Sequence, residues 1–384
     1  MSTAPRSAPV SAPPAAPLSI AERLGADPRF TGKGVVAAFL DAGFYAHPDL
    51  TQPHSRIHGY VDLIGRQSGV ENLSRVDASS WHGMMSSVVA AGNGALSGGR
   101  YRSLTPDLGV VLVKVGTLSR VHHDDITRGI EWVLVNRPRY DIRILNISCG
   151  GDYEVSYLED TLSRFAEAAI RAGIVVVAAV GNNGARPGYV VPPASVPAVI
   201  SVGGINDFGD PSLGRLLPYR SSYGPTIDGI QKPEVITLAD FVAAPILPGT
   251  PTAREAALLA KLDAAADSDL SGLIAENRGV FAPLDAVEGR PPYLVRQVIA
   301  AGLHDGSVID EHYKRVDGTS FAAPIVTSVV AQMLEANPGL TPGQVKRLLL
   351  TTAERVSGID VDRQGWGVVR PRAAVDAALR LNGK

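Results

Sequence analysis

The sequence predicts an α/β protein with a doubly wound, mostly parallel sheet flanked by helices. Several short runs consist almost entirely of apolar and β-branched residues, as strands buried on both faces do. Helix-like stretches separate these runs, and the alternation of strand and helix produces parallel pairing. The predicted strands are Gly34–Leu40, Val110–Val115, Ile142–Ile147, Ile174–Val180 and Ala198–Val202. Functional residues of such sheets gather at the carboxyl ends of the strands.

Helices are predicted between the strands and again near the C-terminus. Thr341 followed by Pro342 has the pattern of an N-cap with proline at the first helical position. The predicted helices are Gly83–Ala91, Asp124–Val135, Tyr157–Ala172, Thr252–Ala266, Ser320–Asn337, Thr341–Ala353 and Arg372–Leu381.

The composition excludes several classes of protein. The chain has 384 residues, and 36 Lys+Arg against 38 Asp+Glu give a net charge of −2. That balance excludes the strong positive charge with which proteins bind nucleic acid or anionic membranes. No run approaches the roughly 18 apolar residues of a membrane span. The single cysteine excludes an internal disulfide framework and a multi-cysteine metal cluster.

The chain divides into a short extension and one large domain. Residues 1–17 are rich in Pro and Ala and are predicted to be a solvated linker, with docking over the site as the alternative. They contain no apolar stretch of signal-peptide length, so we expect a cytoplasmic protein, with a mature secreted form as the alternative. The domain spans 18–384 and contains a long insertion at about 237–315.

Asp41, His82 and Ser320 are the candidate parts of a nucleophilic triad. Asp41 ends the first predicted strand, and His82 opens a helix-like stretch, although such residues are commonly a turn former and a structural histidine. Ser320 follows a Gly-Thr turn at a helix start, with Pro324 expected in the first turn. There the free backbone N–H groups favour a developing anion. A serine hydroxyl needs a positioned base, and the base needs an orienting carboxylate. The order Asp, His, Ser is known for this geometry.

Asn182 is the candidate oxyanion donor. It follows a buried run in the sequence AAVGNNG, so its amide is predicted at the carboxyl end of a strand. Taken alone, an asparagine there is commonly a turn residue with positive φ. Beside the three candidate triad residues, the interpretation as a hydrogen-bond donor to an oxyanion is favoured.

These motifs together resemble the subtilisin-like serine proteases, the subtilases. The resemblance extends from about Gly32 to Asn382, apart from the insertion, and it implies a three-layer subtilisin-like fold and a serine endopeptidase. The motifs that carry it are DAGFYAHPDL from Asp41, HGMMSSVVAAGNG from His82, NISCGG at 146–151, AAVGNNG at 178–184, RSSYGP at 220–225, KPEV at 232–235 and GTSFAAP at 318–324.

The resemblance implies a role for each matching residue. Asp41 would orient His82, which would take the Ser320 proton and pass it to the leaving amine. Ser320 would form an acyl-enzyme, while Asn182 and the Ser320 N–H would hold the oxyanion. A polypeptide substrate would pair with the edge strand formed by Ser148, Cys149 and Gly150. The other wall of its S1 pocket would be formed by Ala178, Ala179, Val180 and Gly181. The resemblance implies no organic cofactor, and the oligomeric state stays open.

Several residues depart from the family pattern. Ala42 stands where a small hydroxyl residue is usual, which loses one possible hydrogen bond near Asp41. Met84 and Met85 are predicted to pack in the core face of their helix, with a modest shift in catalytic geometry as the alternative. Cys149 is interpreted as a small buried hydrophobic residue, with a thiol lining the pocket as the alternative.

Calcium binding is left open and is not required. Asp49 matches a carboxylate that binds calcium in many relatives, but the loop GNGALSGG departs from their ligand-bearing form. A run that begins at Asp267 like an EF-hand has Arg278 in place of the Glu at position 12, so that motif fails.

Two alternative functions remain beside a broad endopeptidase. One alternative is a dedicated processing protease that cuts a single partner or precursor peptide. The long insertion favours this function if it forms a cap or arm that limits access of substrates to the site. The other interpretation of the insertion is a surface decoration remote from the site. A non-cleaving peptide-binding scaffold is opposed by the complete triad and Asn182. For an enzyme, we expect activity to rise as His82 loses its proton near pH ~6–7.

Overall fold

The central sheet has the strand order β3-β2-β4-β1-β5-β6-β7-β8, with β9 also paired to β7. The computed structural model describes residues 16–184, 186–304 and 307–382. The inner strands are parallel, which confirms the α/β class, and they are β1 (Val36–Asp41), β4 (Gly109–Lys114), β5 (Ile142–Ile147), β6 (Val175–Ala179) and β7 (Ile200–Asn206). Every predicted strand is present, with shifted ends except for β5.

Four further strands that were not predicted extend the sheet. β2 (Ile57–Asp62) pairs parallel to β4, β9 (Val235–Leu238) pairs parallel to β7, and the edges are the antiparallel β3 (Gln67–Ser68) and β8 (Leu217–Pro218). The residues of β2 alternate between buried and more exposed at its start. A half-exposed strand has no continuous apolar run, which explains why the pattern was missed.

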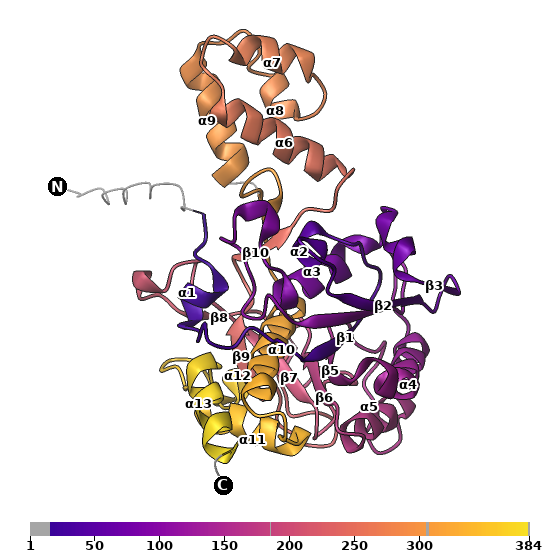
Figure 1. The fold of residues 1–384 in the computed structure, drawn as a ribbon. Helices are drawn as coiled ribbons and strands as arrows, with labels where there is room; N and C mark the ends of the chain where they lie inside the picture. Colours follow the sequence, from indigo (N-terminus) through magenta and orange to yellow (C-terminus); the bar gives the residue numbers. More distant parts are fainter. Residues whose placement is uncertain (1–15, 185, 305–306, 383–384) are drawn as a thin grey trace, which may run out of the picture.

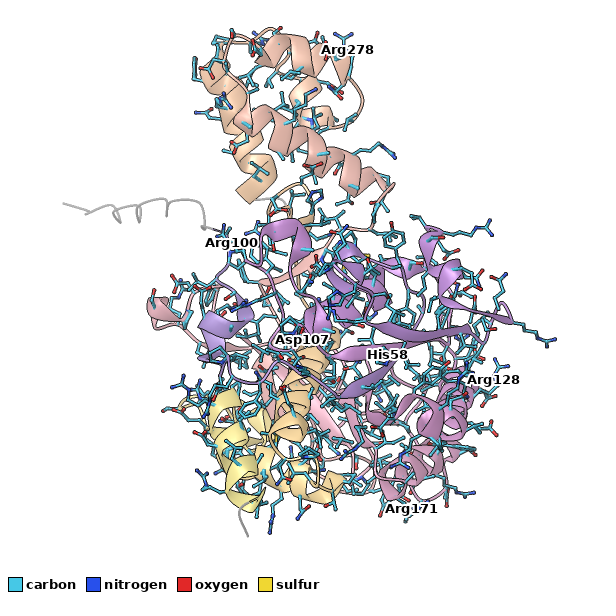
Figure 2. All side chains as sticks on the ribbon, viewed as in Figure 1. His58, Arg100, Asp107, Arg128, Arg171 and Arg278 are labelled. Carbon is cyan, nitrogen blue, oxygen red and sulfur yellow. The ribbon has the colours of Figure 1, made fainter. Side chains whose placement is uncertain are left out.

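Helices cover both faces of the sheet (Figure 1). The residues of β1 alternate between two cores: Ala37 and Phe39 pack into one, and Ala38 and Leu40 into the other. The first core contains α3 (Ser80–Ala91), α10 (Thr319–Ala336) and α13 (Pro371–Asn382), and the second contains α4 (His123–Tyr140) and α5 (Thr161–Arg171). On the outer surface of this second layer, Arg128 and Arg171 point away from the sheet (Figure 2).

The other helices outside the insertion are short or lie near the chain ends. They are α1 (Ile20–Leu24), α2 (Pro48–Thr51), α11 (Pro342–Thr352) and α12 (Val361–Gln364). Three expectations about helix starts need correction. α3 begins at Ser80 rather than Gly83, so His82 lies inside the helix instead of opening it. α5 begins at Thr161 rather than Tyr157, because the Asp160 carboxylate caps it by accepting from the N–H of Ser163. Pro324 lies in the second turn of α10 rather than the first, because that helix begins at Thr319.

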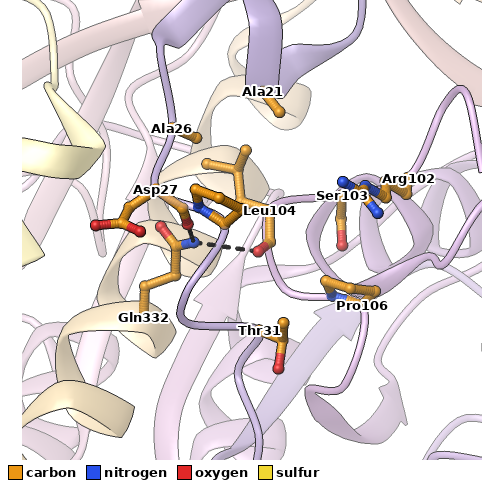
Figure 3. Close-up of a pocket in the computed structure, with 10 residues that line it drawn as sticks. Ala21, Ala26, Asp27, Thr31, Arg102, Ser103, Leu104, Pro106 and Gln332 are labelled. Carbon is orange, nitrogen blue, oxygen red and sulfur yellow. Dashed lines mark hydrogen bonds between the residues drawn. The ribbon is translucent and has the colours of Figure 1, made fainter.

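α10 is held against the N-terminal segment by Gln332. The Gln332 Nε2 group donates to the carbonyl oxygens of Asp27 (2.9 Å), Phe30 (2.8 Å) and Leu104 (3.2 Å). The side chain borders a cavity of about 80 Å³ between these segments (Figure 3). These bonds tie the helix that carries Ser320 to two loops, one around Asp27 and Phe30 and one around Leu104.

The insertion consists of a two-stranded ribbon and a group of helices. β10 (Val242–Pro245) pairs antiparallel with β11 (Tyr313–Val316). Between them lie α6 (Pro251–Ala264), α7 (Leu270–Glu276), α8 (Ala282–Asp285) and α9 (Pro292–His304), which we call the helical arm (residues 251–304). The arm has a core of its own, which includes Leu259, Ile274 and Ile299, and it projects from the body of the molecule (Figure 1). Among the residues described, no helix combines the length and the apolar character needed to cross a membrane.

Candidate active site

Asp41 is the last residue of β1, so its carboxylate lies at the carboxyl edge of the sheet. The residue is 1% exposed, and its charge is met by three donors. The Ala42 N–H donates to Oδ1 (2.7 Å), Ser86 Oγ lies 3.3 Å from Oδ2, and His82 Nδ1 is 2.8 Å from Oδ1 and 2.9 Å from Oδ2. An ionised carboxylate can only accept, so Nδ1 carries the proton and Nε2 keeps a free lone pair.

His82 lies in the first turn of α3, which packs closely against the end of β1. A Cβ atom on the next residue, Gly83, would lie 2.2 Å from the Gly43 carbonyl oxygen and 2.8 Å from Asp41 Cβ, so only glycine permits this approach. The His82 side chain is 22% exposed, and its ring lies 5.7 Å from the ring of Phe321. His82 thus contacts Asp41, as expected, and also lies beside Phe321, the residue after Ser320.

The pKa of His82 is raised above its ordinary value of 6.5. Burial of the ring lowers the pKa, but the charge of Asp41 and the hydrogen bond to it raise the pKa by more. A general base must be neutral, so we expect kcat/KM to increase with pH along a limb centred above 6.5. Asp41→Asn removes the charge and should move this limb to lower pH. The measurement is kcat/KM from about pH 5 to 9, and a flat profile would exclude His82 as the base.

Ser320 is the second residue of α10 and contacts Ser148, and the residue after it, Phe321, lies beside the His82 ring. Its Oγ donates to the carbonyl oxygen of Ser148 (3.0 Å), and no hydrogen bond joins it to the His82 ring, although the structure describes both side chains. Rotation about the Cα–Cβ bond moves the hydroxyl between staggered positions. Catalytic hydrogen bonds commonly form only when a substrate binds.

Ser148 compensates for the proline in α10. Pro324 has no N–H, so the carbonyl oxygen of Ser320, four residues earlier, lacks its helical partner. Ser148 Oγ donates to that oxygen (2.9 Å), and Asn146 Nδ2 in turn donates to Ser148 Oγ (2.9 Å). Ser148 therefore holds the main chain of Ser320 in addition to its expected place in a substrate strand. Sequence reasoning missed this role, although a proline four residues after Ser320 is a visible signal for it.

The amide of Asn182 is oriented by Thr319. Asn182 Oδ1 accepts from the N–H of Thr319 (2.9 Å) and from its Oγ1 (3.0 Å), and the residue is exposed, so the Nδ2 donors are available to an incoming group. The absent Cβ of Gly318 would lie 3.8 Å from Nδ2. The positive φ of this loop belongs to Gly181 (103°) and not to Asn182, so the interpretation of Asn182 as a positive-φ turn residue is wrong.

The two segments that are predicted to contact the substrate differ in how exposed they are. Gly150 is exposed, whereas Ala178, Ala179 and Val180 are buried and Gly181 is half-buried, so the second wall can offer mainly backbone. The Cys149 thiol lies 3.8 Å from the carbonyl oxygen of Leu40, and burial raises its pKa well above the ordinary range. Cys149 packs against the second core but is only half-buried, so it is less enclosed than a fully buried hydrophobic residue.

Met84 and Met85 lie in the core, as predicted. Met84 is fully buried and Met85 is 4% exposed, and both belong to the apolar cluster beneath α3. The two methionines therefore add apolar contacts on the face of α3 that points away from solvent.

The surroundings of Asp49 do not fit a calcium ion. Its side chain is fully buried, and Oδ2 accepts a hydrogen bond from the hydroxyl of Tyr313 (2.7 Å). Oδ1 lies 3.4 Å from the N–H of Leu96 and 3.6 Å from Nδ1 of His47. Within the described residues, no three His, Cys, Asp or Glu side chains gather as a metal site. Calcium needs six to eight oxygen ligands. Here the Asp49 carboxylate instead accepts a hydrogen bond from Tyr313 of β11.

Tyr313→Phe is expected to lower the free energy of unfolding by about 1–3 kcal/mol, because it leaves the buried Oδ2 of Asp49 without its donor. Thermal unfolding with and without calcium measures this effect. Tyr101→Phe is the matched control, since Tyr101 packs on Tyr313 with ring centroids 5.2 Å apart but does not bond Asp49. Recovery of the lost stability on addition of calcium would show that a cation site exists there after all.

Comparison with known proteins identifies relatives over most of the chain. Residues 32–367 match the sequence model of the subtilase family, peptidase S8. The chain is 30% identical to the serine protease AprX of Bacillus subtilis (strain 168), over 90% of this chain and 67% of that one. It is 26% identical to Mycosin-1 of Mycobacterium tuberculosis, over 90% and 69% of the two chains. The structure of the Clostridium perfringens CspB protease is similar in fold, with a TM-score of 0.67 at 14% identity, covering 92% of this chain and 96% of that one.

Proposed function

The chain belongs to the subtilase family and is a serine endopeptidase, and we propose that it cleaves peptide bonds through Asp41, His82 and Ser320 with an acyl-enzyme intermediate. The observation that supports this mechanism most directly is the contact of His82 Nδ1 with the buried Asp41 carboxylate, at 2.8 Å. Because Nδ1 is bonded to Asp41, Nε2 is the only basic atom left in the His82 ring. His82 belongs to α3, which packs against the helix that carries Ser320.

The proposed reaction proceeds in two halves. Nε2 of His82 takes the Ser320 proton as Oγ attacks the substrate carbonyl carbon, and Asp41 stabilises the imidazolium that forms. The negative charge on the carbonyl oxygen is met by Asn182 Nδ2 and by the N–H of Ser320, an amide of the first helical turn. The imidazolium then protonates the leaving amine, and a water molecule hydrolyses the acyl-enzyme by the same sequence of proton transfers.

The substrate is a polypeptide, and we propose that it binds as an extended strand beside residues 148–150. Main-chain hydrogen bonds of this kind bind nearly any sequence, so selectivity comes from side-chain contacts. The exposed position of Gly150 and the buried alanines of the opposite wall are consistent with a cleft that discriminates weakly by charge.

A serine-directed phosphonate probe tests the proposal. We expect the native chain to be labelled and Ser320→Ala to remain unlabelled, with casein digestion measured in parallel. Ser328→Ala is a matched control, because Ser328 is a buried serine of the same helix that donates only to the Ile325 carbonyl (2.7 Å). A folded native chain that takes no label would contradict an assembled triad.

The helical arm favours a second candidate function, a dedicated processing protease. A cavity of about 390 Å³ lies between the arm and the body. It is lined by Tyr45, Pro48 and Leu96 of the body and by Ala253, Arg254 and Ala257 of α6. In this proposal the arm selects one partner or precursor polypeptide by contacts outside the catalytic residues.

Removal of the arm distinguishes the two functions. The Ile246 N–H donates to the His312 carbonyl oxygen (2.8 Å), so a two-residue turn can replace residues 247–311 and leave the β10–β11 ribbon intact. A dedicated enzyme should lose activity on its own precursor and keep activity on short peptides. Equal activity of both forms on protein and peptide substrates would leave the arm without a role in selection.

A further inference from the structure

Ser86 lies beneath the catalytic carboxylate, on the side opposite to the main-chain donor. It belongs to α3, one turn after His82, and it is fully buried. Its Oγ is 3.3 Å from Asp41 Oδ2 and 3.4 Å from the carbonyl oxygen of Gly83. The single hydroxyl proton of Ser86 can therefore be donated either to the Asp41 carboxylate or to the Gly83 carbonyl oxygen.

The surrounding hydrogen bonds favour the carboxylate. The carbonyl oxygen of Gly83 already accepts from Ser87 Oγ at 2.8 Å, so its demand for a further donor is small. Among the residues that the structure describes, Asp41 Oδ2 has only His82 Nδ1 as another donor, at 2.9 Å, whereas Oδ1 has both His82 and the Ala42 N–H. An ionised oxygen is also the stronger acceptor.

Ala42 explains why this donor matters. The residue after Asp41 has a methyl group and cannot donate a side-chain hydrogen bond to the adjacent carboxylate. A carboxylate that is 1% exposed cannot recruit bulk water in place of the missing donor. The required hydroxyl comes instead from a residue 45 positions away in the sequence.

We propose that Ser86 is a positioning residue of the triad, whose hydroxyl holds Asp41 Oδ2 in the orientation that directs His82 toward Ser320. The proposal rests on the proposed function, because it assigns Ser86 a part in the same proton transfers. Ser86 acts through Asp41 and touches neither the substrate nor the reacting atoms.

Ser86→Ala is expected to lower kcat by about 3- to 10-fold and to leave KM within about 2-fold, because a charge-assisted bond is lost away from the substrate. The carboxylate then carries more charge toward His82, so the acidic limb of kcat/KM should move to higher pH. The titratable groups next to Asp41 are His82, the Cys149 thiol and Lys114 of β4, whose Nζ lies 3.6 Å from Asp62.

Ser87→Ala is the matched control. Ser87 is also a fully buried serine of α3, but it donates to the carbonyls of Gly83 and Met84 and does not contact Asp41. We expect Ser87→Ala to change thermal stability about as much as Ser86→Ala but to change kcat and the pH limb much less, because the Ser86 hydroxyl is still present beside Asp41. Equal kinetics of the two variants would overturn the proposal.

A rescue variant separates positioning from a packing defect. Adding Ala42→Ser to Ser86→Ala supplies a hydroxyl from the other side of the carboxylate, and we expect it to restore most of kcat and the original pH limb. A restored melting temperature without restored kcat would also overturn the proposal. Phosphonate labelling distinguishes this failure from failure of the proposed function, because labelling of Ser320 in the native chain does not depend on Ser86.

Discussion

Replacing Ser320 by alanine is expected to lower kcat by about 10⁶-fold, the magnitude known for the corresponding serine of subtilisin, another member of this family. The variant keeps the fold of α10 but has no nucleophile for the carbonyl carbon. His82→Ala should cost about as much, and the double variant should cost little more, because nucleophile and base act as one unit.

Chromogenic peptide hydrolysis at high enzyme concentration measures these losses. Circular dichroism and thermal unfolding show whether each variant is folded, and Ser328→Ala supplies a neutral serine substitution in the same helix. A loss of less than about 100-fold in folded Ser320→Ala would mean that another residue attacks the substrate, since the oxyanion donors alone retain only a small part of the rate enhancement.

The second large effect is expected for Asn182→Ala, with a loss of about 10² to 10³ in kcat and little change in KM, the magnitude known for the equivalent asparagine of subtilisin. The physical reason is that Nδ2 binds the oxygen only after it has become negative. The interaction therefore contributes to the transition state and not to substrate binding.

Two neighbouring substitutions sharpen this prediction. Asn183→Ala is the matched control, because it removes an amide one residue further along the same loop. Thr319→Val removes one of the two donors to Asn182 Oδ1, at 3.0 Å, and keeps the N–H at 2.9 Å, so we expect a smaller loss of kcat than for Asn182→Ala. A rise in KM equal to the loss of kcat/KM would assign Asn182 to substrate binding instead.

The strands and the approximate positions of the catalytic candidates were predictable from local patterns. The apolar runs of β1, β4, β5, β6 and β7 are continuous because both faces of these strands are covered by helices. Asp41 and Asn182 follow such runs, so their place at the carboxyl edge of the sheet was predictable without coordinates. β2 was missed because its partly exposed residues interrupt the apolar pattern.

The hydrogen-bond partners of the same residues were not predictable. Ala42 suggested a donor lost from Asp41, but the structure supplies one from Ser86. Asp49 suggested a cation, but the hydroxyl of Tyr313, 264 residues later, binds it. Pro324 suggested only a tolerated helical proline, but Ser148 satisfies the carbonyl oxygen that it leaves free.

Sequence alone was therefore sufficient for the fold class, the family resemblance and the order Asp41, His82, Ser320, because periodicity and short motifs are local properties of the chain. Tertiary structure was needed to decide which donor meets each buried carboxylate or carbonyl group. A hydrogen bond depends on the approach of two groups within a few tenths of an ångström. Here the two groups come from elements far apart in the sequence, so only packing of the helices on the sheet determines the pair.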